Sequence, residues 1–175
     1  MTSALDSATL LRAGDAECLV SDQRTLRLLL DSSDTGGALS THRISLREGV
    51  EGAAPHRHLT TTELFYVLSG AVDLLAGEDV VHAVEGDLVV VPPGIDHAFG
   101  ASADADGELL VLITPGIDRF AFFRAAHRIA LGEADPSVLA DPEHRFDNHT
   151  ASALALQEWR SGRPVLQHPT RGEQR

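Results

Sequence analysis

The centre of the chain contains two short segments in which histidine, glutamate, glycine and proline stand at a fixed spacing. In the first segment, one residue separates His56 from His58, and Glu63 follows after four more. In the second, two residues separate the turn sequence Pro92-Pro93-Gly94 from His97. Side chains alternate between the two faces of a strand, so His56 and His58 point to the same side. A bend or bulge after His58 would return Glu63 to that point, and the proline-rich turn starts a separate strand that carries His97.

This spacing indicates a metal centre. Three neutral imidazoles and one carboxylate form a mixed ligand set that suits Fe, Mn, Ni, Zn or Cu and contains too much nitrogen for Mg or Ca. The alternative is four polar residues scattered over the surface of a barrel, and any one of these histidines alone would favour it. The joint spacing argues against coincidence. We therefore predict one divalent transition metal per chain, bound by His56, His58, Glu63 and His97.

Short apolar or alternating segments, separated by turn sequences, extend from about residue 10 to residue 114. They predict about eight to ten short strands, which is typical of an all-β sandwich or barrel. Because the metal motif occurs once, we expect a single barrel. Ser69-Gly70 is expected to be a turn between two of its strands.

The composition changes after the last predicted strand. Asp118 is a suitable N-cap for a helix that extends to about Ala130 and has an apolar stripe. This helix either packs against the outside of the barrel, which is the simpler interpretation, or forms a lid over its mouth. We expect residues 1–116 to form the barrel, 117–162 a helical extension and 163–175 a disordered tail.

The two segments resemble the paired motifs of the cupins, small jelly-roll β-barrels that bind one divalent metal. Val50 stands where the first motif usually opens with glycine, and Ala101 stands where the second usually closes with asparagine. More narrowly, the stretch AGDAECLV, the TGG before the first core strand and the helical tail after LLVLITPG are similar to those of single-barrel cupins of the quercetin dioxygenase-like group. The resemblance implies an all-β, cupin-type double-stranded β-helix (jelly-roll) barrel with a short C-terminal α-helical extension. It also implies that the four residues named above are the metal ligands.

Strand alternation places further side chains beside the ligands. We expect the substrate pocket to be lined by inward-facing residues of these strands, namely Phe65, Val67, Val89, Val91 and Phe99. His42 joins them if the apolar face of its strand points inward; otherwise it is a solvated strand histidine. Such an apolar, partly aromatic pocket suits a planar or hydrophobic small molecule. No inward Lys or Arg is evident, because Arg43 and Arg57 fall on the opposite face.

The leading hypothesis is a metal-dependent oxygenase that acts on a small aromatic or enolisable substrate. The resemblance to quercetinase-like cupins implies that Glu63 is also catalytic and accepts the substrate proton. A second hypothesis is a redox-neutral enzyme, such as an isomerase or a polyketide cyclase. A third is a non-catalytic protein that binds a small molecule and holds a structural metal. Oxygen consumption separates the first from the second, and an open coordination position argues against the third.

The charge balance excludes one class of partner. A net charge of −12, from 14 basic and 26 acidic residues, repels phosphate backbones, so we expect no binding to nucleic acid. The sequence has no run of 18 apolar residues and no signal-peptide pattern, so we expect a cytoplasmic protein without membrane contact. An apolar early strand can pair with a second copy at a sheet edge, and we therefore expect a homodimer.

Overall fold

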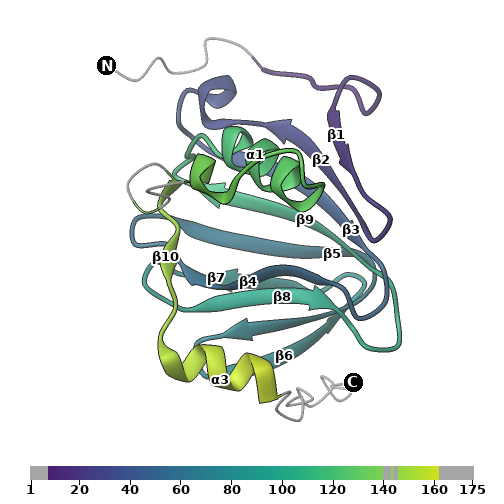
Figure 1. The fold of residues 1–175 in the computed structure, drawn as a ribbon. Coiled ribbons are helices and arrows are strands. Elements are labelled where there is room, and N and C mark those ends of the chain that lie inside the picture. The colour runs from purple at the N-terminus through teal and green to yellow at the C-terminus, as the bar shows by residue number, and fades with distance from the viewer. Residues whose placement is uncertain (1–7, 140–142, 144–145, 162–175) are drawn as a thin grey trace, which may run out of the picture.

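The computed structural model describes residues 8–139, 143 and 146–161, which fold into an antiparallel β-barrel followed by helices (Figure 1). This confirms the predicted all-β barrel with a C-terminal helical extension. The strands are β1 (Glu17–Val20), β2 (Arg24–Leu30), β3 (Ser40–Leu46), β4 (Glu51–Arg57), β5 (Thr62–Ala76), β6 (Asp79–Val84), β7 (Leu88–Val91), β8 (His97–Ala101), β9 (Gly107–Thr114) and β10 (His149–Thr150). The helices are α1 (Phe120–Ala130) and α3 (Ala153–Ser161), and short 3-10 helices lie at Ser32–Thr35 and Pro136–Leu139.

Strand β5 joins the two halves of the barrel. The strand order is β1-β2-β3-β9-β5-β8-β4-β10, and β6 and β7 also pair with β5. The first half of β5 pairs with β7 and β9, whereas its second half pairs with β6 and β8. The prediction of a turn at Ser69-Gly70 is therefore wrong. The strand continues through these residues because its register with β9 shifts between Val67 and Ser69 and Gly70 adopts a φ of +70°.

Apolar side chains from both halves fill the interior of the barrel. The fully buried members of this core include Phe65, Val67, Val72, Leu74, Leu109 and Val111. Strand β3 follows the predicted alternation, since His42 and Ile44 are 6% and 5% exposed while Arg43 pairs with Glu108 on the outer face. His42 therefore lies inside the barrel and is not a solvated strand histidine.

Helices α1 and α3 lie at opposite ends of the barrel in Figure 1, α1 near β2 and β9 and α3 beside β6. Helix α3 packs Ala155 and Trp159 against a second apolar cluster that includes Leu75 and Ala98. None of the helices in the described part of the chain is long and apolar enough to cross a membrane. The predicted tail, residues 163–175, lies outside the described residues.

Replacement of Gly70 should destabilise the barrel. Its positive φ disfavours L-residues, and a Cβ built there would lie 1.9 Å from the carbonyl oxygen of Asp106. We expect Gly70→Ala to lower the free energy of unfolding by about 2 kcal/mol or more, measured by urea denaturation. Gly86→Ala is the matched control, because its φ is +91° but no atom lies within 4 Å of the added Cβ. Equal losses in the two variants would contradict the close approach to Asp106.

Candidate metal centre

The four predicted ligands come together inside the barrel. His56 lies in β4, His58 follows it in the loop before β5, Glu63 lies in β5 and His97 begins β8. Their ligand atoms all lie within 4.8 Å of one another. Oε2 of Glu63 is 2.8 Å from Nε2 of His97 and 3.2 Å from Nε2 of His58. None of the four residues is more than 9% exposed, so the cluster is largely withdrawn from water.

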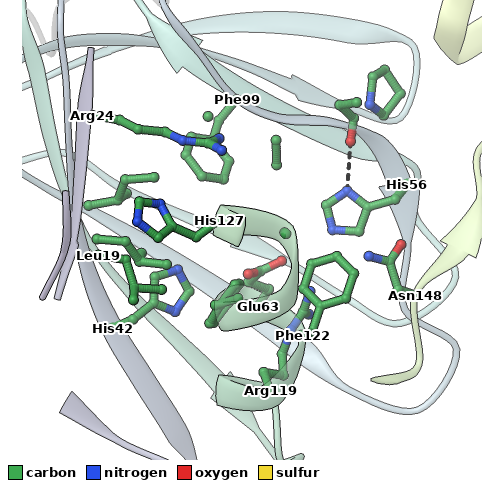
Figure 2. A pocket seen from close by; sticks show the side chains of 18 residues that line it. Leu19, Arg24, His42, His56, Glu63, Phe99, Arg119, Phe122, His127 and Asn148 are labelled. Atoms are coloured by element: carbon green, nitrogen blue, oxygen red, sulfur yellow. Dashed lines mark hydrogen bonds between the residues drawn. The ribbon is translucent and has the colours of Figure 1, made fainter. Parts of the chain in front are cut away.

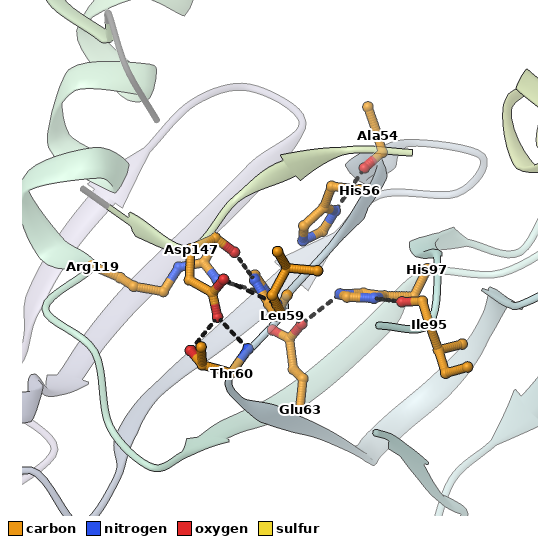
Figure 3. Close-up of polar contacts among 10 residues, drawn as sticks. Ala54, His56, Leu59, Thr60, Glu63, Ile95, His97, Arg119 and Asp147 are labelled. Atoms are coloured by element: carbon orange, nitrogen blue, oxygen red, sulfur yellow. Dashed lines mark hydrogen bonds and ion pairs between the residues drawn. The ribbon is translucent and has the colours of Figure 1, made fainter. Parts of the chain in front are cut away.

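Backbone carbonyls fix the orientation of all three imidazole rings (Figure 3). Nδ1 of His56 lies 2.8 Å from the oxygen of Ala54, and Nδ1 of His97 lies 2.9 Å from the oxygen of Ile95. Nδ1 of His58 is held in the same way by the oxygen of Asp147. A carbonyl only accepts, so each Nδ1 must carry its hydrogen, and each neutral ring then has its lone pair on Nε2.

The cluster fits a cation. With Nδ1 as the donor, Nε2 of His58 and of His97 face a carboxylate oxygen of Glu63 as acceptor against acceptor. Either extra protons or a metal ion must relieve this repulsion, and a neutral imidazole with its second nitrogen tied to a carbonyl is the usual form of a histidine ligand. The cluster can therefore hold a metal ion.

The pKa values agree with this ligand set. Burial, followed by repulsion from His97, lowers the pKa of His56 to about 3, so its imidazole is neutral at pH 7. Burial alone would raise the pKa of Glu63, but hydrogen bonds from His58 and His97, which form when extra protons occupy their Nε2 atoms in place of a metal, outweigh it and hold that pKa well below its usual range. Neutral imidazoles and an ionised carboxylate are the forms that bind a metal.

A cavity of about 340 Å³ adjoins the cluster (Figure 2). Two of the predicted ligands, His56 and Glu63, line it directly. Much of the rest of its wall is apolar and comes from Leu19, Leu26, Ile44, Phe99, Phe122 and Phe123. Its other polar or charged lining residues are Arg24, His42, Arg119, His127 and Asn148.

The structure corrects part of the predicted pocket. His42 and Phe99 line the cavity, but Phe65, Val67, Val89 and Val91 do not. Phe65 and Val67 are fully buried in the core, Val91 is 2% exposed, and Val89 packs against the same core. Strand alternation places these side chains inward, but the core fills the interior around them. Phe65 still supports the site from behind, because its ring lies 5.3 Å from that of Phe99 and 6.1 Å from that of His97.

Helix α1 forms one wall of the cavity. Its residues Phe122, Phe123, Ala126 and His127 line the cavity, and the ring of Phe123 lies 4.7 Å from that of His42. Packing against the outside of the barrel, the simpler of the two predicted positions, is therefore wrong for this helix. Its apolar stripe faces the cavity next to the metal cluster.

Arg119, immediately before α1, is a site residue that the sequence did not indicate. It is 4% exposed, and its Nη1 lies 2.9 Å from Nε2 of His58. Its guanidinium also lies over the rings of Phe122 and Phe123, at 5.7 and 5.5 Å from their centroids. Burial lowers the pKa of Arg119, but an arginine side chain stays charged at any physiological pH. Strand alternation could not indicate Arg119, because it lies outside the strands that flank the ligands.

Asp147 is a second residue that the sequence did not indicate. Its backbone oxygen accepts the hydrogen bond from His58, while its carboxylate accepts from the backbone nitrogens of Leu59 and Thr60 at 2.9 and 3.0 Å. Its φ of +48° is uncommon for a residue other than glycine. Asp147 thus fixes the loop that carries His58, and only the folded chain brings it there.

Comparisons with known proteins agree with the fold. Residues 42–113 match the family model of the cupin domain. No curated protein matches the chain. Among solved structures, KdgF from Halomonas sp. is 17% identical, with a TM-score of 0.54 over 62% of this chain and 94% of that one.

Two further solved structures are similar in fold and are described as enzymes. The nucleoside dehydratase Pac13 from Streptomyces is 16% identical, with a TM-score of 0.52 over 65% of this chain and 87% of that one. The polyketide cyclase RemF from Streptomyces resistomycificus is 19% identical, with a TM-score of 0.51 over 61% of this chain and 79% of that one. At these identities, the likeness is one of fold.

Stability should depend on pH through His42. Burial lowers its pKa to about 4, below the usual value of about 6.5. Between these values the unfolded chain binds a proton that the folded chain does not. Above about pH 6.5, His42 therefore does not change the free energy of unfolding. As the pH falls to about 4, proton binding to His42 in the unfolded chain lowers that free energy by roughly 3 kcal/mol. We expect His42→Leu to lose less stability than the wild type between pH 7.5 and pH 4.5, measured by urea denaturation with a chelator present. If the free energy of unfolding fell equally with pH in His42→Leu and in the wild type, this prediction would be wrong.

The N-terminus of α1 should depend on Asp31 and not on the predicted cap, Asp118. The Asp31 carboxylate accepts from the backbone nitrogens of Arg119 and Phe120 at 2.8 and 3.1 Å, whereas Asp118 accepts from Ser33. We expect Asp31→Ala to lower the free energy of unfolding by about 1–2 kcal/mol, measured by thermal unfolding, and Asp118→Ala to lower it less. The reverse order would show that the helix is capped as the sequence predicted.

Proposed function

We propose that this chain is a small cupin-type protein and a metal-dependent enzyme that acts on a small aromatic or enolisable substrate. The reaction proposed first is a quercetinase-like oxygenation. One observation carries the proposal: His56 and Glu63 belong to the ligand cluster and also line the largely apolar cavity. A substrate in the cavity would therefore lie next to the metal.

The proposed chemistry divides between the metal and the chain. A divalent transition metal bound by His56, His58, Glu63 and His97 would act as a Lewis acid toward a substrate oxygen and, if redox-active, would permit reaction with dioxygen. The rings of Phe99, Phe122 and Phe123 would hold a planar substrate and exclude water. Glu63 lines the cavity, and one of its carboxylate oxygens would accept the proton of a substrate hydroxyl.

A second candidate is a redox-neutral reaction in the same cavity. Two proteins of this fold are described as a nucleoside dehydratase and a polyketide cyclase. A dehydration or a cyclisation would use the same proton acceptor and the same Lewis acid but would consume no oxygen. A purely structural metal is less consistent with the cavity, because two of the four ligand residues are open to it.

Metal analysis tests the proposal first. We expect the purified wild type to contain one transition metal per chain, and His97→Ala to contain less than about a tenth of that amount. Glu63→Gln should lower the metal affinity by at least about tenfold, because it removes the anionic ligand. His82→Ala is the control, since His82 pairs with Asp73 in β6 and β5, outside the cluster.

The identity of the metal directs the activity assay. A redox-active metal with oxygen uptake on flavonol-like enols would support the oxygenase, whereas zinc without oxygen uptake would support the redox-neutral reaction. No metal in the wild type, and none taken up on reconstitution, would refute both.

A further inference from the structure

Arg119 carries a buried positive charge without an anionic partner at ion-pair distance among the described residues. Its Nε has no hydrogen-bond partner within that part of the chain, and its Nη1 contacts only the neutral acceptor Nε2 of His58. A guanidinium that is 4% exposed is costly unless an anion compensates it. Arg119 also lines the cavity. An anionic group of a substrate bound in the cavity could therefore reach the guanidinium.

The carboxylates of Glu63, Asp147 and Asp31 attract this charge, but none of them is at ion-pair distance from the guanidinium among the described residues. Asp31 accepts from the backbone nitrogens at the start of α1. Asp147 accepts from Leu59, Thr60 and His149. Oε2 of Glu63 lies against His58 and His97 in the ligand cluster.

The contact between Arg119 and His58 also competes with metal binding. Nδ1 of His58 is held by the oxygen of Asp147, so Nε2 offers one lone pair. That lone pair can accept from Arg119 or bind a metal, but it cannot do both. If His58 is a metal ligand, Arg119 needs another acceptor inside the cavity.

We propose that Arg119 binds the carboxylate of the substrate, and that the cavity therefore accepts small aromatic acids. This inference rests on the proposed function and narrows its substrate class. The planar guanidinium matches a carboxylate through two parallel N–H···O hydrogen bonds. The rings of Phe122 and Phe123 beside it provide an apolar surface for the aromatic part. Arg119 is thus a specificity-determining residue and not a metal ligand.

Calorimetric titration with two probes of equal shape tests the proposal. We use 2-hydroxybenzoate and its neutral amide, 2-hydroxybenzamide, on the protein as purified. The wild type should bind the acid at least about tenfold more tightly than the amide, since the acid adds a charge-assisted pair of hydrogen bonds. In Arg119→Gln, the two affinities should agree within about twofold, and Arg119→Lys should give an intermediate ratio.

Arg128→Gln is the matched control, because Arg128 is an exposed arginine of helix α1 and does not line the cavity. It should keep the wild-type ratio. Metal content and thermal unfolding are measured for every variant, and Arg119→Gln should keep its metal. A preference for the acid that persists in Arg119→Gln, or no preference in a metal-containing wild type, would overturn the inference and leave the proposed function intact. Absence of metal from the wild type would refute the proposed function, while the ratio of affinities would still test Arg119.

Discussion

Three imidazole nitrogens and a carboxylate oxygen face one another inside the barrel, and much of the surrounding structure serves to hold them there. Groups that only accept hydrogen bonds repel each other in a dry interior, where each unsatisfied charge is costly. The chain fixes the rings from behind with the oxygens of Ala54, Ile95 and Asp147. The resulting cluster has a strong requirement for a cation, and this requirement connects the fold with the proposed chemistry.

The strand pairing explains how the cluster forms. β4 and β8 pair with two shifts of register that leave His56 opposite His97, while β5 brings Glu63 from the facing half of the barrel. Gly52 permits close packing at this point, because a Cβ there would lie 2.1 Å from the ring of Phe99. That ring consequently lies over β4 and becomes part of the cavity wall. Each ligand is thus held by a rigid strand or by a loop that Asp147 fixes.

Local sequence patterns predicted the ligand cluster and the barrel, because both depend on short-range geometry. The spacing of His56, His58 and Glu63 follows from strand alternation and one bend, and β3 buried His42 as its apolar face required. Alternation indicates the direction of a side chain but not its depth, so Phe65 and Val67 were assigned to the pocket when they belong to the core. Arg119 and Asp147 lie 61 and 89 residues from His58 in sequence, and no local pattern encodes contacts of that range.

The residues that the sequence pattern predicted and those that it missed lie in different parts of the site. The cupin match spans residues 42–113 and contains all four members of the ligand cluster. The wall that faces them comes from beyond that match, with Arg119, Phe122 and Phe123 at the start of α1 and Asn148 just before β10. A barrel of this kind can hold a metal for many reactions, as one fold commonly does. The proposed selection of a substrate rests on the charge and the aromatic surface of the facing wall. In this chain, the segment after the matched region supplies the buried cation next to the cluster, and the proposed recognition of a substrate carboxylate therefore rests on residues outside the cupin match.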